Sequence, residues 1–232
     1  MADPYVEYDD IAQRWYVSEL DPNALLFAVS IDADPLHGFS EHLYQVGPGP
    51  GDLLDFDKIG YNADAVFLTA TDQSSTPDHS HVVIAIDKAS ILGPSPTFVS
   101  YVSLPPVHDL SFFIPAEMHG ARTGMPEYFV QDAGSLDAVS DHVDIVTMTN
   151  FLSNSPTYNF TDIPVNPYAE LTTSADQPTA PGMVMTNGTQ FTQADWRNGK
   201  LATAHSVFEP DDNYATSRVR WYQSTPPAPH RR

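Results

Sequence analysis

The chain has 232 residues, of which 41% are hydrophobic and 11% aromatic, enough to bury one sizeable core or several small ones. Ten basic against 30 acidic side chains give a formal net charge of −20, which repels nucleic-acid phosphates and anionic membranes but suits divalent cations. There is no cysteine, which excludes disulfides and thiolate chemistry. No apolar run approaches the about 18 residues that span a bilayer, and the first residues lack the regions of a secretory leader. We therefore expect neither nucleic-acid nor membrane partners.

Short apolar or alternating runs, bounded by Gly, Pro, Asn and Asp, fill most of the chain, and 21 prolines punctuate them. This pattern predicts an all-β protein. In chain order, the runs that predict strands lie at residues 5–20, 25–34, 40–46, 56–72, 81–92, 97–104, 110–134, 142–152, 157–165, 191–208 and 217–223.

The runs recur as one unit: a first strand, a polar turn, a strongly apolar second strand, a third strand and an amphipathic fourth. Units of four strands at this spacing are typical of the blades of a β-propeller. We predict about four blades of four-stranded antiparallel sheet in a single domain, residues 1–223, with an incomplete last blade. The alternative is a β-sandwich, which also has short strands and frequent turns but does not explain the shared internal order. The predicted segments are blades at 4–47, 54–104, 109–165 and 189–223, a long inter-blade loop at 166–188 and a disordered tail at 224–232.

Four pieces of sequence carry a resemblance to known proteins: "YDDIAQRWYVSEL" with "LLFAVSIDADPLHGF", "DFDKIGYNADAVFLTATD", "IAIDKASIL", and "WRNGKLATAHSV" followed by "SRVRWYQ". Together they resemble large, mostly uncharacterised bacterial β-propeller proteins, which are often secreted or at the cell surface. The resemblance covers most of residues 5–223. It implies a ring with more blades than this chain supplies, and it implies no settled activity.

The fourth unit ends after its third predicted strand, and the residues before the first strand are too few to supply the missing one. An open blade presents unpaired backbone groups and an apolar flank. We therefore expect a homodimer in which two half-rings complete a larger ring. The alternative is a compact four-bladed ring with a frayed last blade.

In a propeller, the first strand of each blade lines a central channel, which predicts that acidic and histidine side chains converge there. Several carboxylates around one axis require a cation or bound protons, and Ca²⁺ with oxygen ligands meets that need. The metal-site candidates of these strands are Asp55, Asp57, Glu117 and His119, and the candidates for catalysis are Asp57, His119 and Asp195; Glu7 and Asp9 would join them. The alternative is that these acids are turn residues facing water.

Histidines offer a second metal site. His79 and His81 lie on one side of an extended segment, and such a pair could bind Zn²⁺ with a distant third ligand and activate water. The alternative for this pair is an exposed loop. His205, in an alternating apolar run after the Asn198-Gly199 turn, is expected to pack and to hydrogen-bond a carbonyl or a carboxylate.

The sequence contains no Gly-rich phosphate loop, no H-E-x-x-H and no G-x-S-x-G, so no organic cofactor and no standard enzyme class is predicted. We expect a binding or scaffold module that associates with itself and binds a divalent cation. The alternative is a metal-dependent hydrolase, of esterase, lactonase or phosphotriesterase type, whose channel residues activate water. Sugar recognition by Trp15, Trp196 and Trp221 is a weaker third possibility, because these side chains also suit packing between blades.

Overall fold

The structure is a computed structural model, and it describes residues 2–21, 24–45, 54–72, 80–93, 98–104, 112–133, 139–169, 175–176, 183–184, 188–214 and 216–227. These residues form strands and turns, with two short 3₁₀ helices at Pro35–His37 and Pro210–Asp212. The prediction of an all-β chain is confirmed. In this part of the chain, no helix has the length and apolar character to cross a membrane.

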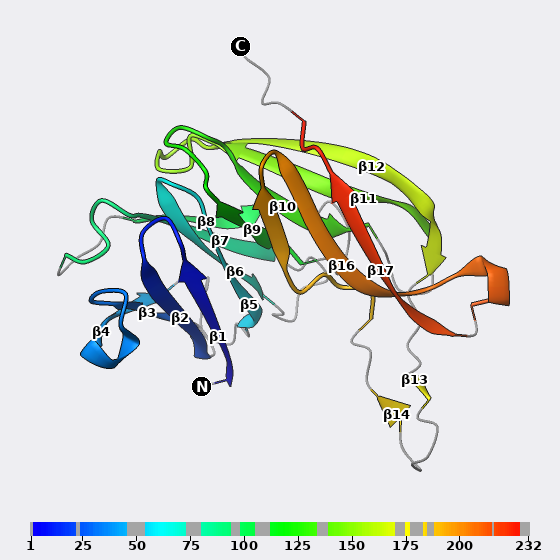
Figure 1. Cartoon of the computed structure of the whole chain (residues 1–232), viewed down its shortest axis with the longest axis horizontal. Coiled ribbons are helices and arrows are strands. Elements are labelled where there is room, and N and C mark those ends of the chain that lie inside the picture. The colour runs from blue at the N-terminus through cyan, green and yellow to red at the C-terminus, as the bar shows by residue number, and fades with distance from the viewer. Residues whose placement is uncertain are drawn as a thin grey trace.

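The strands follow one another in four antiparallel meanders, which we call units one to four (Figure 1). Unit one is β1 (Ala2–Asp9), β2 (Arg14–Asp21), β3 (Ala24–Ser30) and β4 (Phe39–Gln45). Unit two is β5 (Leu54–Tyr61), β6 (Ala65–Asp72), β7 (Ser80–Asp87) and β8 (Phe98–Leu104). Unit three is β9 (Ile114–His119), β10 (Glu127–Asp132), β11 (Val139–Thr149) and β12 (Thr157–Ala169). Unit four is β15 (Ala194–Arg197), β16 (Lys200–Phe208) and β17 (Ser217–Ser224).

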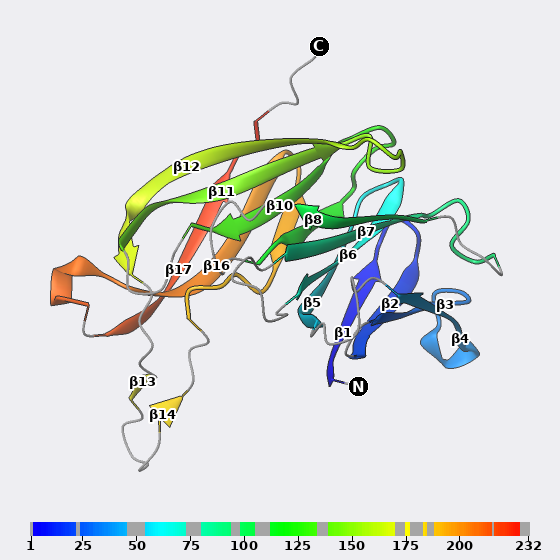
Figure 2. The ribbon, with the colours of Figure 1, turned by 180° about the vertical axis from the view of Figure 1, so that it is seen from behind.

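The segment predicted as a loop, residues 166–188, begins inside β12 and contains the short hairpin of β13 (Ala175–Asp176) and β14 (Met183–Val184). In Figure 2 this hairpin projects away from the main sheets. Of the predicted tail, residues 228–232 lie outside the described residues.

Turn residues account for how the first two strands connect in units one, two and four. Asp9 Oδ1 accepts hydrogen bonds from the backbone N–H groups of Ile11 and Ala12, at 2.9 and 3.0 Å, which caps the β1–β2 turn. The side chain of Asn62 does the same for the β5–β6 turn. Between β15 and β16, Asn198 and Gly199 both have positive φ, 52° and 79°, as a two-residue type I′ hairpin requires.

The four units are not separate blades, and the structure does not show a four-bladed propeller. The reason is that the first strands pair directly: β9 lies parallel to β5 and to β15, so that units two, three and four join into one 11-stranded sheet. One further pair, Ala169 with Phe208, links β12 to β16 and closes β9, β10, β11, β12, β16 and β15 into a six-stranded barrel. Unit one remains a separate four-stranded sheet.

The close approach of β5 and β9 depends on a glycine. A Cβ atom at Gly60 would lie 2.6 Å from the Cβ of Pro115 and 2.8 Å from the carbonyl oxygen of Ala116, closer than real contacts allow. Only glycine lets the two backbones come so near.

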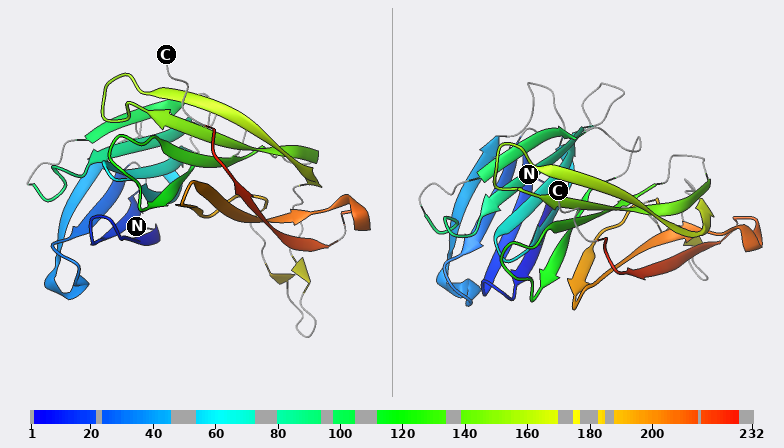
Figure 3. Two further views of the ribbon diagram at one scale, coloured as in Figure 1. Left: turned by 45° about the horizontal axis from the view of Figure 1, so that its top comes forward. Right: turned by 90° about the horizontal axis from the view of Figure 1, so that it is seen from above.

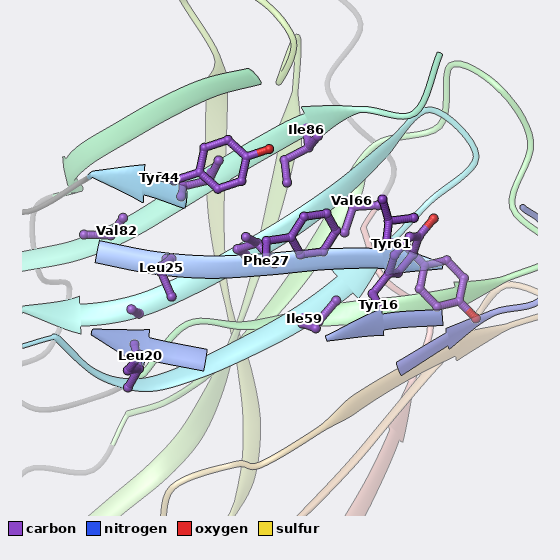
Figure 4. Packing of buried hydrophobic residues seen from close by; sticks show 14 of the residues in the cluster. Tyr16, Leu20, Leu25, Phe27, Tyr44, Ile59, Tyr61, Val66, Val82 and Ile86 are labelled. Carbon is purple, nitrogen blue, oxygen red and sulfur yellow. The ribbon is translucent and has the colours of Figure 1, made fainter. Parts of the chain in front are cut away.

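The apolar core consists of three layers, each between two successive units. The first lies between units one and two (Figure 4), where Tyr16, Leu25 and Phe27 face Ile59, Val66 and Ile86. The second lies between units two and three, where Phe67 and Val83 face Phe129 and Val146. The third lies between units three and four, where Val130 and Ile145 face Phe191, Leu201 and Val207. Units two and three are therefore covered on both faces.

Candidate functional site

A cluster of acidic, imidazole and phenol groups lies where the first strands of the four units come together. We call it the axial cluster and define it as Glu7, Asp10, Tyr61, Glu117, His119, Gln193 and Asp195. The cluster forms because β15 pairs with β9 in parallel register, which sets Asp195 directly opposite Glu117, and because Tyr61 of β5 pairs with Glu117 on the other side.

His119 is the centre of the axial cluster. Its Nδ1 lies 3.0 Å from the hydroxyl of Tyr61 and 3.2 Å from Asp10 Oδ1, while its Nε2 lies 3.8 Å from both Glu117 Oε2 and Asp195 Oδ2. The Tyr61 hydroxyl also donates to Asp10, at 3.1 Å. The imidazole side chain is 16% exposed, whereas those of Asp10 and Asp195 are about half exposed, so solvent reaches the cluster from one side.

Glu7 and Glu117 form a carboxyl pair beside this imidazole. Burial, together with the charge of Glu117 and a hydrogen bond to it, raises the pKa of Glu7 to about 8. Gln193 donates from Nε2 to Glu117 Oε1 across 2.6 Å and so holds the second carboxylate in place. At pH 7 Glu7 is therefore mostly protonated, and its carboxyl is hydrogen-bonded to that of Glu117. This arrangement can move a proton toward or away from a group that reaches His119.

The predicted convergence of first-strand residues holds for Glu7, Glu117, His119 and Asp195 but does not extend to Asp9 or Asp57. The buried Asp57 accepts a short hydrogen bond from Ser18 Oγ of unit one and lies beside Lys58. A bulge explains the difference: the register of β5 against β6 shifts between Asp55 and Lys58, and Phe56 has a φ of 58°.

The environment of Asp57 differs from that of the axial cluster. Burial raises the pKa of Asp57 to about 6, although the hydrogen bond from Ser18 works in the opposite direction. Asp55 is half-buried, and its Oδ1 accepts from the N–H of Phe56 at 2.9 Å. The expected set of Asp55, Asp57, Glu117 and His119 is therefore divided between two places on β5 and β9.

The histidine pair is only half described. His79 lies outside the described residues, and His81 is a buried residue of β7. The imidazole of His81 lies 4.8 Å from the ring of Phe113, between the centroids, and 3.5 Å from Thr71 Oγ1. His81 therefore packs between units two and three. Across the described residues, no three His, Asp or Glu side chains are grouped so that they could hold a metal ion.

His205 is buried in β16, as the sequence indicated. Its ring stacks on Phe191 at 4.4 Å between centroids, and its Nδ1 lies 2.6 Å from the carbonyl oxygen of Thr189. Burial lowers the pKa of this histidine, so it is neutral at pH 7.

Sequence reasoning did not select Asp10, Tyr61 or Gln193 as site residues. Asp10 follows β1 directly, in the turn to β2. Tyr61 is the last residue of β5, just before the turn to β6, and Tyr8 stands just before the turn to β2 in unit one. This repeated tyrosine is a signal in the sequence that could have pointed to Tyr61. Gln193 precedes β15, and no local pattern distinguishes it.

No protein-family model matches the chain, and a search of curated proteins found no significant match. The resemblance to bacterial propeller proteins stays a prediction.

Proposed function

We propose that the protein is an assembly module that binds a second copy of itself, head to tail, through the outer faces of units one and four. The observation that carries this proposal is a set of large apolar side chains left exposed on those two faces: Val6 (57%), Leu43 (54%), Val219 (79%) and Trp221 (71%). The two faces lie at opposite ends of the molecule, unit one in blue and unit four in orange to red (Figure 3).

The internal layers support a second copy as the partner. Units two and three each pack one face against the preceding unit and the other face against the following unit. The outer face of unit one is equivalent to the faces with which units two to four contact their predecessors. The outer face of unit four is equivalent to the faces that contact a successor. A second copy presents the matching face at both ends.

Burial along the strands agrees with this arrangement. In unit two, β6 and β7 are apolar and buried almost without interruption, because both faces are covered. In β2 of unit one, buried and half-buried residues alternate, and β17 of unit four also alternates. Yet the open face of each terminal unit carries apolar side chains where an ordinary solvated face carries polar ones.

The two faces differ in relief. On unit one, Val6, Val17 and Ala28 lie opposite one another across β1, β2 and β3, and Leu26 lies opposite Leu43. A hollow of about 570 Å³ lies over β2, β3 and β4 of this face.

On unit four, the large side chains stand beside small ones. Trp221 is paired with Ala204, and Val219 is paired with Ser206. The tryptophan therefore projects as a knob, which suits the hollow of unit one.

A head-to-tail interface rotates each copy relative to the one before it. Where these rotations add up to a full turn the copies form a closed ring, and otherwise they form an open chain. We propose the closed form with two copies, a propeller-like ring in which all faces are covered. The net charge of −20 on each copy opposes association, so the apolar contact must exceed that repulsion.

Sedimentation tests the proposal. We expect the wild-type chain to be a dimer at micromolar concentration, and Trp221→Asp and Leu43→Asp each to dissociate to monomers. Each variant keeps one intact face, so mixing the two restores a heterodimer through one interface. Leu36→Asp, at a residue that is 89% exposed in a turn of unit one, is the matched control and keeps the dimer. A wild-type monomer at all concentrations, or two variants that fail to combine, would overturn head-to-tail association.

A second function is favoured by the axial cluster, in which a carboxyl pair lies beside an imidazole. We propose as the alternative that Glu7, Glu117 and His119 transfer protons in the hydrolysis of an ester, lactone or phosphoester, with or without Ca²⁺ or Zn²⁺. Turnover of activated esters and phosphotriesters, measured with EDTA and with each added cation, tests it. Activity that falls at least tenfold in His119→Asn supports this function, and no turnover under any of these conditions refutes it.

A further inference from the structure

The buried ion pair between Lys88 and Asp9 has a distinctive setting. Lys88 follows β7 of unit two, and its Nζ is in direct contact with Oδ2 of Asp9, the last residue of β1 in unit one. The side chain of Lys88 is 9% exposed and that of Asp9 is completely buried. A buried ion pair is an expensive way to join two sheets, because both charges lose their hydration.

The surroundings of the pair contain a third buried titratable group. Glu127, the first residue of β10 in unit three, has no exposed surface, and its Oε1 accepts from the N–H of Ala116 at 3.2 Å. Asn62 lies between the two: its carbonyl oxygen accepts from Lys88 Nζ, and its side chain is close enough to influence the Glu127 carboxyl. Three units thus meet at one water-poor point.

Burial disfavours the charged forms of both Lys88 and Glu127. Burial lowers the pKa of Lys88, although Asp9 partly offsets it. Burial raises the pKa of Glu127 well above its usual range, which favours the protonated form of this carboxyl. A desolvated lysine is a good nucleophile when it carries no proton.

The oxygen atoms of Asp9 have different partners. Oδ1 accepts two backbone N–H groups, from Ile11 at 2.9 Å and Ala12 at 3.0 Å, and these distances match those of an oxyanion hole. Oδ2 accepts from the hydroxyl of Tyr16 at 2.8 Å and touches Lys88 Nζ. An attack on Cγ would therefore develop negative charge on an oxygen that already has two donors.

We propose that Lys88 and Asp9 form an intramolecular isopeptide bond that covalently joins unit one to unit two. The Nζ–Cγ bond forms and the Cγ–Oδ2 bond breaks. An ammonium and a carboxylate become an amide and one water, with the two protons lost from Nζ leaving on Oδ2, so that no oxidant or other reactant is needed. Oδ1 becomes the amide oxygen and keeps its two hydrogen bonds in the β1–β2 turn.

Two groups assist this step. Glu127 gives its proton toward the departing oxygen and regains one from Nζ, so that it ends as it began, and Tyr16 holds that oxygen by its hydrogen bond. The fold supplies the high effective concentration of amine and carboxyl, and the site excludes water that would reverse the reaction. Since the chain has no cysteine, such an amide would be a cross-link independent of redox conditions.

Mass spectrometry of the purified full chain tests the proposal. We expect the denatured wild-type protein to be lighter than its sequence mass by one water, about 18 Da. Trypsin should leave the peptide of residues 1–14 linked to residues 59–122, because an acylated Lys88 resists cleavage. A full-length mass with separate peptides 59–88 and 89–122 would overturn the bond.

Variants test whether Lys88 supplies the amine of the proposed bond. Lys88→Arg keeps the charge but removes the nucleophile, so its mass should equal the sequence mass. Lys58→Arg is the matched control, because Lys58 is also buried but donates to the carbonyl oxygen of Asp57 at 2.7 Å, and this variant should still lose water. Water loss that persists in Lys88→Arg would overturn the assignment.

The role of Glu127 has its own readout. Glu127→Gln keeps the size of the side chain but cannot relay a proton, so we expect a folded chain, by circular dichroism, in which most molecules keep the full mass. Complete cross-linking in Glu127→Gln would overturn the relay role while leaving the bond itself established.

Discussion

His205 donates a hydrogen bond from Nδ1 to the carbonyl oxygen of Thr189 across 2.6 Å, and this contact determines the state of the ring. A carbonyl only accepts, so the proton of the neutral imidazole is on Nδ1, and Nε2 must accept from the Tyr222 hydroxyl at 2.9 Å. The histidine thus links β16 to β17 and to the segment before β15, and it serves packing in unit four.

Replacing this histidine should weaken the fold. His205→Ala removes two hydrogen bonds and leaves a cavity beside Phe191, so we expect a loss of about 2–4 kcal/mol in the free energy of unfolding, measured by urea denaturation. His37→Ala, at an exposed histidine paired with Asp32, should cost less than about 1 kcal/mol. Equal effects of the two substitutions would contradict the structural role.

The pKa of Glu7, raised to about 8 from a usual 4.5, predicts how stability changes with pH. Between these values the folded chain binds more protons at this site than the unfolded chain does, so the contribution of Glu7 is fully present below pH 4.5 and is lost as pH rises through 8. Glu7→Gln cannot ionise, so the wild type should lose stability relative to this variant across that window. Urea midpoints measured from pH 4 to 9 check the prediction, and parallel curves would contradict it.

Much of the fold could be predicted from local sequence, because strand order and turn geometry are local properties. The Asn198-Gly199 turn and the alternation around His205 are both read from neighbouring residues. The pairing between units is not local. It depends on a close approach at Gly60 and on a single closing pair at Phe208, neither of which has a sequence period.

The candidate site was likewise predictable only where the strands that carry its residues are regular. The expectation that the first strands of the units lie together brought Glu117 and Asp195 to one place, and β9 and β15 do pair there in parallel. It was not sufficient for Asp57, because a bulge at Phe56 changes the direction of the following side chain. A bulge that uses a non-glycine residue with positive φ leaves no signature in a single sequence.

The contact of β5 with β9 leads to a test of the sheet that joins units two and three. Gly60→Ala places a Cβ 2.6 Å from Pro115, so the strands must separate or shift, and we expect a loss of about 1–3 kcal/mol in the free energy of unfolding. Gly93→Ala, at a turn where the new Cβ would meet one carbonyl oxygen at 3.0 Å, should cost less. Thermal denaturation of both variants distinguishes the outcomes, and an unchanged melting temperature in Gly60→Ala would contradict the parallel pairing.

Salt should strengthen the association of two copies. Each copy carries a net charge of −20, and acidic residues such as Glu19 and Glu41 lie beside the hollow on unit one, so repulsion opposes the approach of a second chain. Raising the salt concentration from about 0.05 to about 0.5 M shortens the Debye screening length of charge interactions from roughly 14 Å to roughly 4 Å. The apolar contacts are kept at the higher salt concentration. We expect the dimer dissociation constant, measured by sedimentation equilibrium, to fall about tenfold or more over such a range.

Glu19→Gln combined with Glu41→Gln should reduce this salt dependence, because two like charges are removed at the rim. A dissociation constant that rises with salt would mean that ion pairs, and not the apolar faces around Trp221 and Leu43, hold the two copies together.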